Sequence, residues 1–214
     1  MTVDKQLIVM TKLYWPGLQL KQVRVQNDRL KYEGLRFRAE CRAAGRLYGQ
    51  PFGVDVAFGD PILREQETVT VDDVLGFAGI ALPTVRLYPV ETHIAEKLHA
   101  YTMPRARPNT RVKDLPDIAL LATTRTLAAS RLRLAFERTF EFRATRLLPS
   151  SLPEPSDNWS LPYREMAGEN ELVWARLEEL SIAAKGFLDP ILANERGIWD
   201  PTKWVWKTHH LQIT

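Results

Sequence analysis

The segment from residue 88 to residue 121 constrains the fold most, because it holds two amphipathic runs separated by prolines. In the first run, apolar residues recur at the spacing of one helical face, which predicts an amphipathic helix. These residues are Val90, Ile94, Leu98 and Tyr101. Pro89 suits the first turn of that helix, where a backbone N–H has no helical partner. Pro104 and Pro108 are expected to end the helix and to form a turn.

A second helix is predicted from near Arg111, and charged residues cluster around the turn that precedes it. Its expected inward residues are Ile118, Leu120 and Leu121. Its opening turn carries Lys113, Asp114 and Asp117, the turn itself carries Arg105, Arg107 and Arg111, and Lys97 lies off the apolar stripe of the first helix. Two hypotheses remain open here. The charges form either a solvated surface of a helical hairpin or a site that handles phosphate groups.

Composition excludes several classes of protein. The 214 residues are 45% hydrophobic and 26% charged, which is typical of a globular protein with a substantial core. Cys41 is the single cysteine, so neither an intrachain disulfide nor a cysteine zinc cage is possible. A net charge of +3 does not identify a nucleic-acid binder. The sequence has no run of about 18 apolar residues and no signal peptide pattern, so a cytoplasmic protein without a membrane span is expected.

The N-terminal part is predicted to hold strands. Residues 18–25 alternate, and residues 35–43 alternate apolar with charged side chains over nine positions, which is typical of a half-buried strand. A second strand over residues 52–58 completes an antiparallel hairpin, and a further strand is predicted at 84–88. Asp55 lies in the middle of the second hairpin strand. It is interpreted either as a solvent-facing residue or as a carboxylate that holds a metal or acts as a base.

The C-terminal part is predicted to be helical. Helices are expected over residues 127–142 and 169–187, with a Pro- and Ser-rich loop at 146–163 between them. The inward faces are expected to hold Leu132, Leu134, Phe136 and Phe140 in the first helix, and Leu172, Val173, Leu177, Leu180 and Ala184 in the second. Trp204 and Trp206 indicate an edge strand or docked tail, and their indoles are interpreted as packing groups rather than a platform for bases.

Together these patterns predict an α+β protein with two domains, residues 1–123 and residues 124–214. Four segments carry a resemblance to a known family: residues 32–60, YPVETHIAEKLHA at 88–100, ARPNTRVKDLPDIALL at 106–121, and the tail pattern of residues 174–190. They resemble nucleotidyltransferase toxins of the AbiEii/AbiGii type, from type IV toxin–antitoxin systems. The third segment is similar to the family string NSRxKDxYDL, with Pro116 in place of its tyrosine.

The resemblance implies a partial nucleotidyltransferase-like fold, with a small mixed or antiparallel sheet followed by a helical region. It also implies transfer of a nucleoside monophosphate from an NTP to an acceptor such as tRNA, with Mg²⁺ and a cognate antitoxin as partner. Lys97 would meet the triphosphate as a point charge, while Asp114 would orient or activate the site with support from Asp117. Asp55 would be a catalytic carboxylate that binds the metal. Arg107, Arg111 and Lys113 would bind nucleotide or RNA.

One departure from the family pattern concerns the metal. Members of the family begin with a Gly-rich segment and an Asp-x-Asp pair that hold Mg²⁺, and neither pattern is found here. The sequence is therefore expected to represent a family member without its first portion, and whether it is active without that portion is left open. Two alternatives remain beside an active transferase: a non-catalytic protein that keeps the nucleotide or partner surface, and a plain helical interaction domain.

Overall fold

The computed structural model forms two compact units, residues 1–60 and residues 61–214. Each unit is described here by itself. The structure describes residues 18–23, 34–43, 46–57, 65–70, 72, 77, 82, 84–104 and 111–207. The expected mixture of helices with small antiparallel sheets is confirmed.

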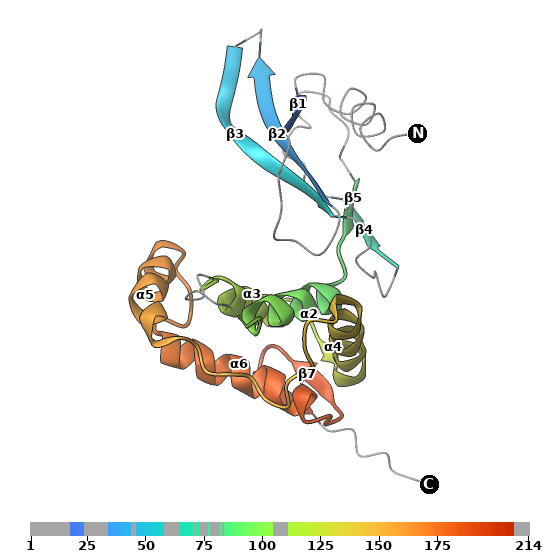
Figure 1. The fold of residues 1–214 in the computed structure, drawn as a ribbon, viewed down its shortest axis with the longest axis vertical. Helices are drawn as coiled ribbons and strands as arrows, with labels where there is room; N and C mark the ends of the chain where they lie inside the picture. The colour runs from blue at the N-terminus through green and yellow to red at the C-terminus, as the bar shows by residue number, and fades with distance from the viewer. Residues whose placement is uncertain are drawn as a thin grey trace. The chain divides into compact units, whose positions relative to one another are not determined.

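The first unit holds a three-stranded antiparallel sheet of order β1-β2-β3 (Figure 1). The strands are β1 Leu18–Val23, β2 Gly34–Ala43 and β3 Arg46–Ala57. The period-two segment therefore forms a strand, as predicted, with Ala39 fully buried. A bulge interrupts the β2–β3 register between Ala39 and Cys41. The second hairpin strand begins earlier than predicted, because pairing with β2 continues back to Arg46.

Asp55 lies in β3, where its Cα pairs with that of Arg36 across the sheet. Its side chain lies outside the residues that the structure describes. Phe52, in the same strand, is 52% exposed.

The second unit begins with a two-stranded hairpin formed by β4 Glu67–Thr70 and β5 Thr84–Leu87. β5 confirms the strand predicted at 84–88. It pairs with β4, which the sequence patterns did not predict, in a sheet of its own.

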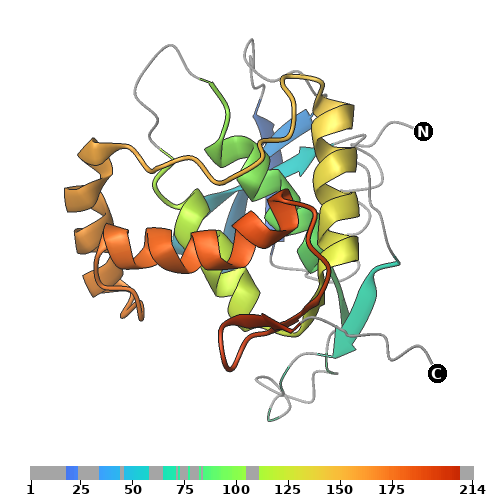
Figure 2. The same ribbon diagram turned by 90° about the horizontal axis from the view of Figure 1, so that it is seen from below.

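Helices α2 to α6 pack on one another and form the core of the second unit (Figures 1 and 2). They are α2 Val90–Tyr101, α3 Asp114–Thr123, α4 Ala129–Arg143, α5 Ser160–Glu169 and α6 Leu177–Leu192. α2 contacts both α3 and α4, while α6 contacts α3, α4 and α5. Side chains from all five helices enclose one apolar core.

The predicted helical faces are confirmed except at three exposed residues, Leu120, Leu134 and Val173. Ile94, Leu98 and Ile118 are fully buried, as their spacing requires. Leu120 is 42% exposed and Leu134 is 48% exposed, so the prediction that they point inward was wrong. Each lies two residues from a buried neighbour, and two residues correspond to about 200° around a helix, which is the opposite face.

The boundary predicted for the last long helix was also wrong. Residues 170–176 are not helical, and Val173 is 89% exposed. The chain reverses at Glu171, whose φ of 51° lies in the left-handed region and ends α5. The loop predicted over 146–163 ends at Ser156, because Asp157–Trp159 form a 3₁₀ turn (η2) that leads into α5. Pro162 is accommodated in the first turn of α5, where no helical N–H bond is lost.

The Trp-rich tail forms a docked edge sheet, as predicted. β7 Ile198–Asp200 pairs with the short β6 Leu127–Ala128 on one side and with β8 Val205–Lys207 on the other. The indole N–H groups of Trp199, Trp204 and Trp206 donate to the carbonyl oxygens of Ala122, Ala183 and Phe187. These bonds hold the rings against α3 and α6, which supports the packing interpretation rather than a platform for bases.

Residues on both sides of Thr123, the end of the first predicted domain, contribute to the same core. Among the described residues, no helix is long and apolar enough to cross a membrane.

Candidate functional site

Two neighbouring helices bring Lys97 together with two carboxylates. Lys97 projects from α2, and Asp114 and Asp117 project from the first turn of α3. Its Nζ donates to Asp117 Oδ2 at 2.5 Å and lies 3.6 Å from Asp114 Oδ1. Because α2 packs directly on α3, residues that are 17 and 20 positions apart in sequence meet in one ion-pair cluster.

Asp114 is the buried member of this cluster, with a side chain only 4% exposed. Arg111 Nη1 lies 3.3 Å from Asp114 Oδ2, so the carboxylate has a cation on each side. An unpaired carboxylate at this depth would carry a large desolvation cost, and the two cations offset it. Removing Asp114 is therefore expected to leave Lys97 and Arg111 less firmly held, and removing either cation is expected to leave the Asp114 carboxylate less well compensated.

Four of the predicted site residues thus lie together: Lys97, Arg111, Asp114 and Asp117. Lys113 is exposed at the N-terminus of α3 and contributes its backbone carbonyl to the bond from the Asp117 N–H. Arg107 lies outside the described residues. Asp55 belongs to the other unit. The predicted catalytic role of these side chains stays a prediction.

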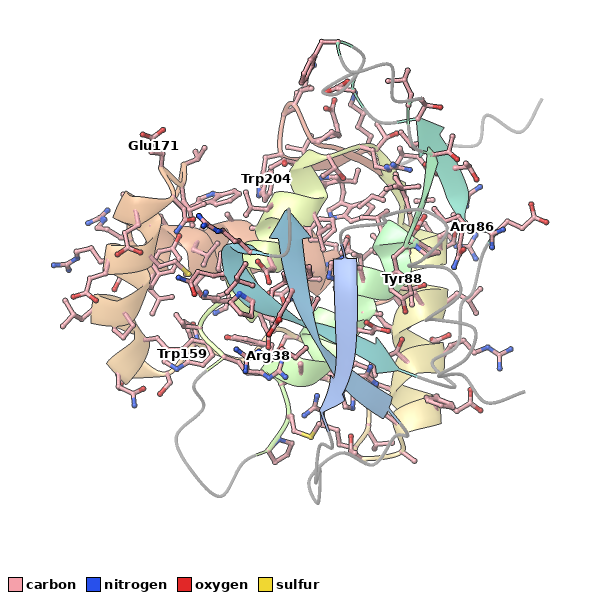
Figure 3. The ribbon with its side chains drawn as sticks, turned by 90° about the horizontal axis from the view of Figure 1, so that it is seen from above. Arg38, Arg86, Tyr88, Trp159, Glu171 and Trp204 are labelled. Carbon is pink, nitrogen blue, oxygen red and sulfur yellow. The ribbon has the colours of Figure 1, made fainter. Side chains whose placement is uncertain are left out.

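A second group of polar contacts on α2 was not predicted from the sequence. The Tyr88 hydroxyl donates to Glu96 Oε1 at 2.6 Å, and Arg143 Nη2 from α4 lies 3.8 Å from the same carboxylate oxygen. Figure 3 shows Tyr88 at the junction of β5 and α2. His93 precedes Lys97 by one helical turn, and its pKa is lowered by burial and by the positive charge of Lys97. The sequence did offer one signal for His93, because residues four apart in a helix, such as His93 and Lys97, lie on the same face.

A pocket of about 300 Å³ opens beside the start of α2 and is called the α2 pocket below. Its walls come from the β4–β5 hairpin, the first turn of α2 and the end of α3, all within the second unit. The lining residues are Glu65, Glu67, Leu87, Tyr88, Pro89, Val90, Glu91, His93, Leu121, Thr124 and Arg125.

The described residues do not fit the Mg²⁺ ion that the resemblance implies. Within the described ranges there is no group of three or more His, Cys, Asp or Glu side chains that could hold a metal. Asp114 and Asp117 form a carboxylate pair, but both face the ammonium group of Lys97. No step is therefore assigned to a metal here.

The cluster nevertheless suits an anionic ligand. The Lys97 side chain is 25% exposed, and its ammonium is held in place by the two carboxylates. A compact ammonium on a fixed stem is a common point-charge partner for phosphate groups.

Comparison with known proteins decides the family. The profile described as nucleotidyl transferase AbiEii toxin, type IV TA system, matches residues 11–179. The chain belongs to the AbiEii family. This confirms the resemblance drawn from the sequence, and AbiEii membership implies a nucleotide substrate and an antitoxin partner. No curated protein gives a significant match to the chain.

Proposed function

We propose that this AbiEii-family chain transfers a nucleoside monophosphate from an NTP to a hydroxyl group of an acceptor such as tRNA. The acceptor oxygen bonds the α-phosphorus as the bond to the bridging oxygen breaks. Pyrophosphate then leaves with that electron pair, and the hydroxyl proton passes to solvent. The observation that carries the proposal is the Lys97 ammonium, held between α2 and α3 by Asp114 and Asp117.

In this proposal, Lys97 contacts the triphosphate and stabilises the negative charge that grows on pyrophosphate. Asp114 positions Lys97 and Arg111 from its buried place between them. Asp117 supports Lys97, while Arg111, Lys113 and Arg107 supply positive charge toward nucleotide or RNA. The roles of Asp55 and Mg²⁺ rest on the family resemblance.

A second candidate function is nucleotide binding without transfer. It is favoured by the pairing of Lys97 with two carboxylates, which offsets its positive charge before any ligand arrives. In that case the cluster would hold a nucleotide weakly and catalyse nothing.

Incubation of the chain with α-labelled NTPs, Mg²⁺ and total tRNA tests the transfer. Lys97→Ala is expected to lower label incorporation by roughly a hundredfold or more, because a charge aimed at the developing pyrophosphate is lost. Lys97→Arg is expected to recover only part of the activity, since a guanidinium fork does not reproduce a point charge. Asp114→Asn should also lower incorporation, because it leaves Lys97 less well positioned.

Lys185→Ala is the matched control, because Lys185 on α6 forms an ion pair with Glu154 and is not a member of the Lys97 cluster. Its activity should equal that of the wild type, and urea unfolding should show that each variant is folded. Label transfer that survives both Lys97→Ala and Asp114→Asn would refute the assignment of this site. Nucleotide binding without any transfer by the wild type would favour the second candidate.

A further inference from the structure

The α2 pocket lies one helical turn from the proposed phosphate contact. His93 lines the pocket, and Lys97 follows it by four residues on the same face of α2. Four residues correspond to a rise of about 6 Å along a helix. The base of a nucleotide whose phosphates contact Lys97 would therefore be able to reach the α2 pocket.

The size and walls of the α2 pocket suit a flat, partly apolar group. About 300 Å³ is at the lower end of the range for small-molecule sites. Leu87, Val90 and Leu121 give apolar walls, and the rings of Tyr88 and His93 meet edge-to-face with centroids 6.2 Å apart. Aromatic side chains beside aliphatic walls are the usual surroundings of a bound nucleobase.

The described charges of the α2 pocket are unfavourable for the phosphate end of a nucleotide. Among the described residues that line it, three are glutamates, Glu65, Glu67 and Glu91, and one is an arginine. That arginine, Arg125, is already paired with Glu67, with its Nη1 2.8 and 2.9 Å from the two carboxylate oxygens. Burial and Lys97 lower the pKa of His93, so its ring is neutral at pH 7 and does not offset the acidic lining.

We propose that the α2 pocket binds a nucleobase that carries an amino group, and that it discriminates against the matching base with a carbonyl group. The identity of the ligand as a nucleotide rests on the proposed function. Ionised carboxylates only accept hydrogen bonds, so they pair with an amino group and repel a carbonyl oxygen. Cytosine presents its N4 amino group where uracil presents O4, and the same contrast separates adenine from hypoxanthine.

Isothermal titration with two matched pairs of ligands tests the discrimination, CTP against UTP and ATP against ITP. Each pair exchanges an amino group for a carbonyl group at one ring position, and the adjacent ring nitrogen changes from an acceptor to an N–H donor. The test therefore compares a carboxylate's contact with the exocyclic amino group against its contact with that ring N–H. The amino member is expected to bind about fivefold to a hundredfold more tightly, the range for a well-placed base contact. The assay measures binding alone, so it does not depend on transfer activity.

Three substitutions test whether the α2 pocket causes the preference for the base with an amino group. In Glu65→Gln and Glu91→Gln, an amide that both donates and accepts replaces a carboxylate, so the preference within each pair should shrink toward unity. Thr124→Trp places a large side chain at the pocket wall from an exposed position, and should weaken both members of a pair. Glu178→Gln, an exposed glutamate on α6, is the matched control and should retain the wild-type preference.

The base could belong to the incoming NTP or to the end of the acceptor RNA, and a second arm of the experiment separates these sources. Short RNAs ending in C or in U are titrated in the same way. A preference among free nucleotides assigns the pocket to the NTP, and a preference only among RNA ends assigns it to the acceptor.

Equal affinity within every pair in both arms would overturn the proposal, as would the absence of binding by any of these ligands. Unchanged affinity for both members of a pair in Thr124→Trp would also overturn it. A preference that Glu65→Gln removes, in a protein that transfers no label, would leave the pocket assignment standing and would refute the transfer alone.

Discussion

Replacing Trp199 with alanine is expected to destabilise the second unit by roughly 3–5 kcal/mol, the usual cost of removing a buried tryptophan. Trp199 is fully buried, and its ring centroid lies 4.8 Å from that of Phe187 and 5.0 Å from that of Trp204. Its Nε1 donates to Ala122 O at 2.9 Å, which joins β7 to the end of α3. The substitution therefore leaves both a large cavity and an unpaired carbonyl group. Urea unfolding at 25 °C, followed by circular dichroism, measures the change.

Trp199→Phe separates the two contributions and keeps the test informative if Trp199→Ala does not fold. It retains most of the apolar volume but leaves Ala122 O without its donor, for which roughly 1–3 kcal/mol is expected. Val173→Ala is the control, because Val173 is 89% exposed and its truncation should change stability by no more than about 0.5 kcal/mol. A Trp199→Ala protein within about 1 kcal/mol of the wild type would contradict the assigned role of the tail.

Acidification is expected to destabilise the protein through His99, a fully buried residue of α2. Burial, together with the positive charges of Arg143 and Arg146, lowers the pKa of His99 to about 4. At pH values well above 6.5 the imidazole is neutral in both states, and His99 causes no pH dependence. As pH falls from about 6.5 to 4, the unfolded chain takes up a proton that the folded chain does not. Stability attributable to His99 should fall by about 3 kcal/mol over this window.

His99→Gln tests the assignment, because glutamine does not titrate and can still bond the hydroxyl of Thr145, which lies 2.7 Å from Nε2 of His99. Unfolding free energies of wild type and variant are compared at pH 7.5 and pH 4.5. The wild type should lose more stability than the variant between these values, and the difference isolates His99 from the other titrating groups. Parallel losses in the two proteins would show that His99 does not carry the effect.

The sequence predicted elements well where the signal is local. The apolar face of α2 and the period-two strand β2 were both predicted, because side-chain direction repeats every 3.6 residues in a helix and every two in a strand. The errors had several causes, and a tertiary contact that defines an element without a local pattern was one of them. β4 has no strong pattern of its own and is defined by its pairing with β5. The helix predicted from Glu169 is interrupted at Glu171, where the chain turns before α6.

By itself, the sequence determined the AbiEii family and the charged residues on the two helices that follow the sheet segments. Motif strings and helical periodicity are local properties that a single chain displays directly. Only the tertiary structure decided that Lys97 meets Asp114 and Asp117, that Asp114 is buried between two cations, and that His93 lines a pocket. Distances between side chains on different helices depend on how the helices pack, and burial depends on every element that covers a residue.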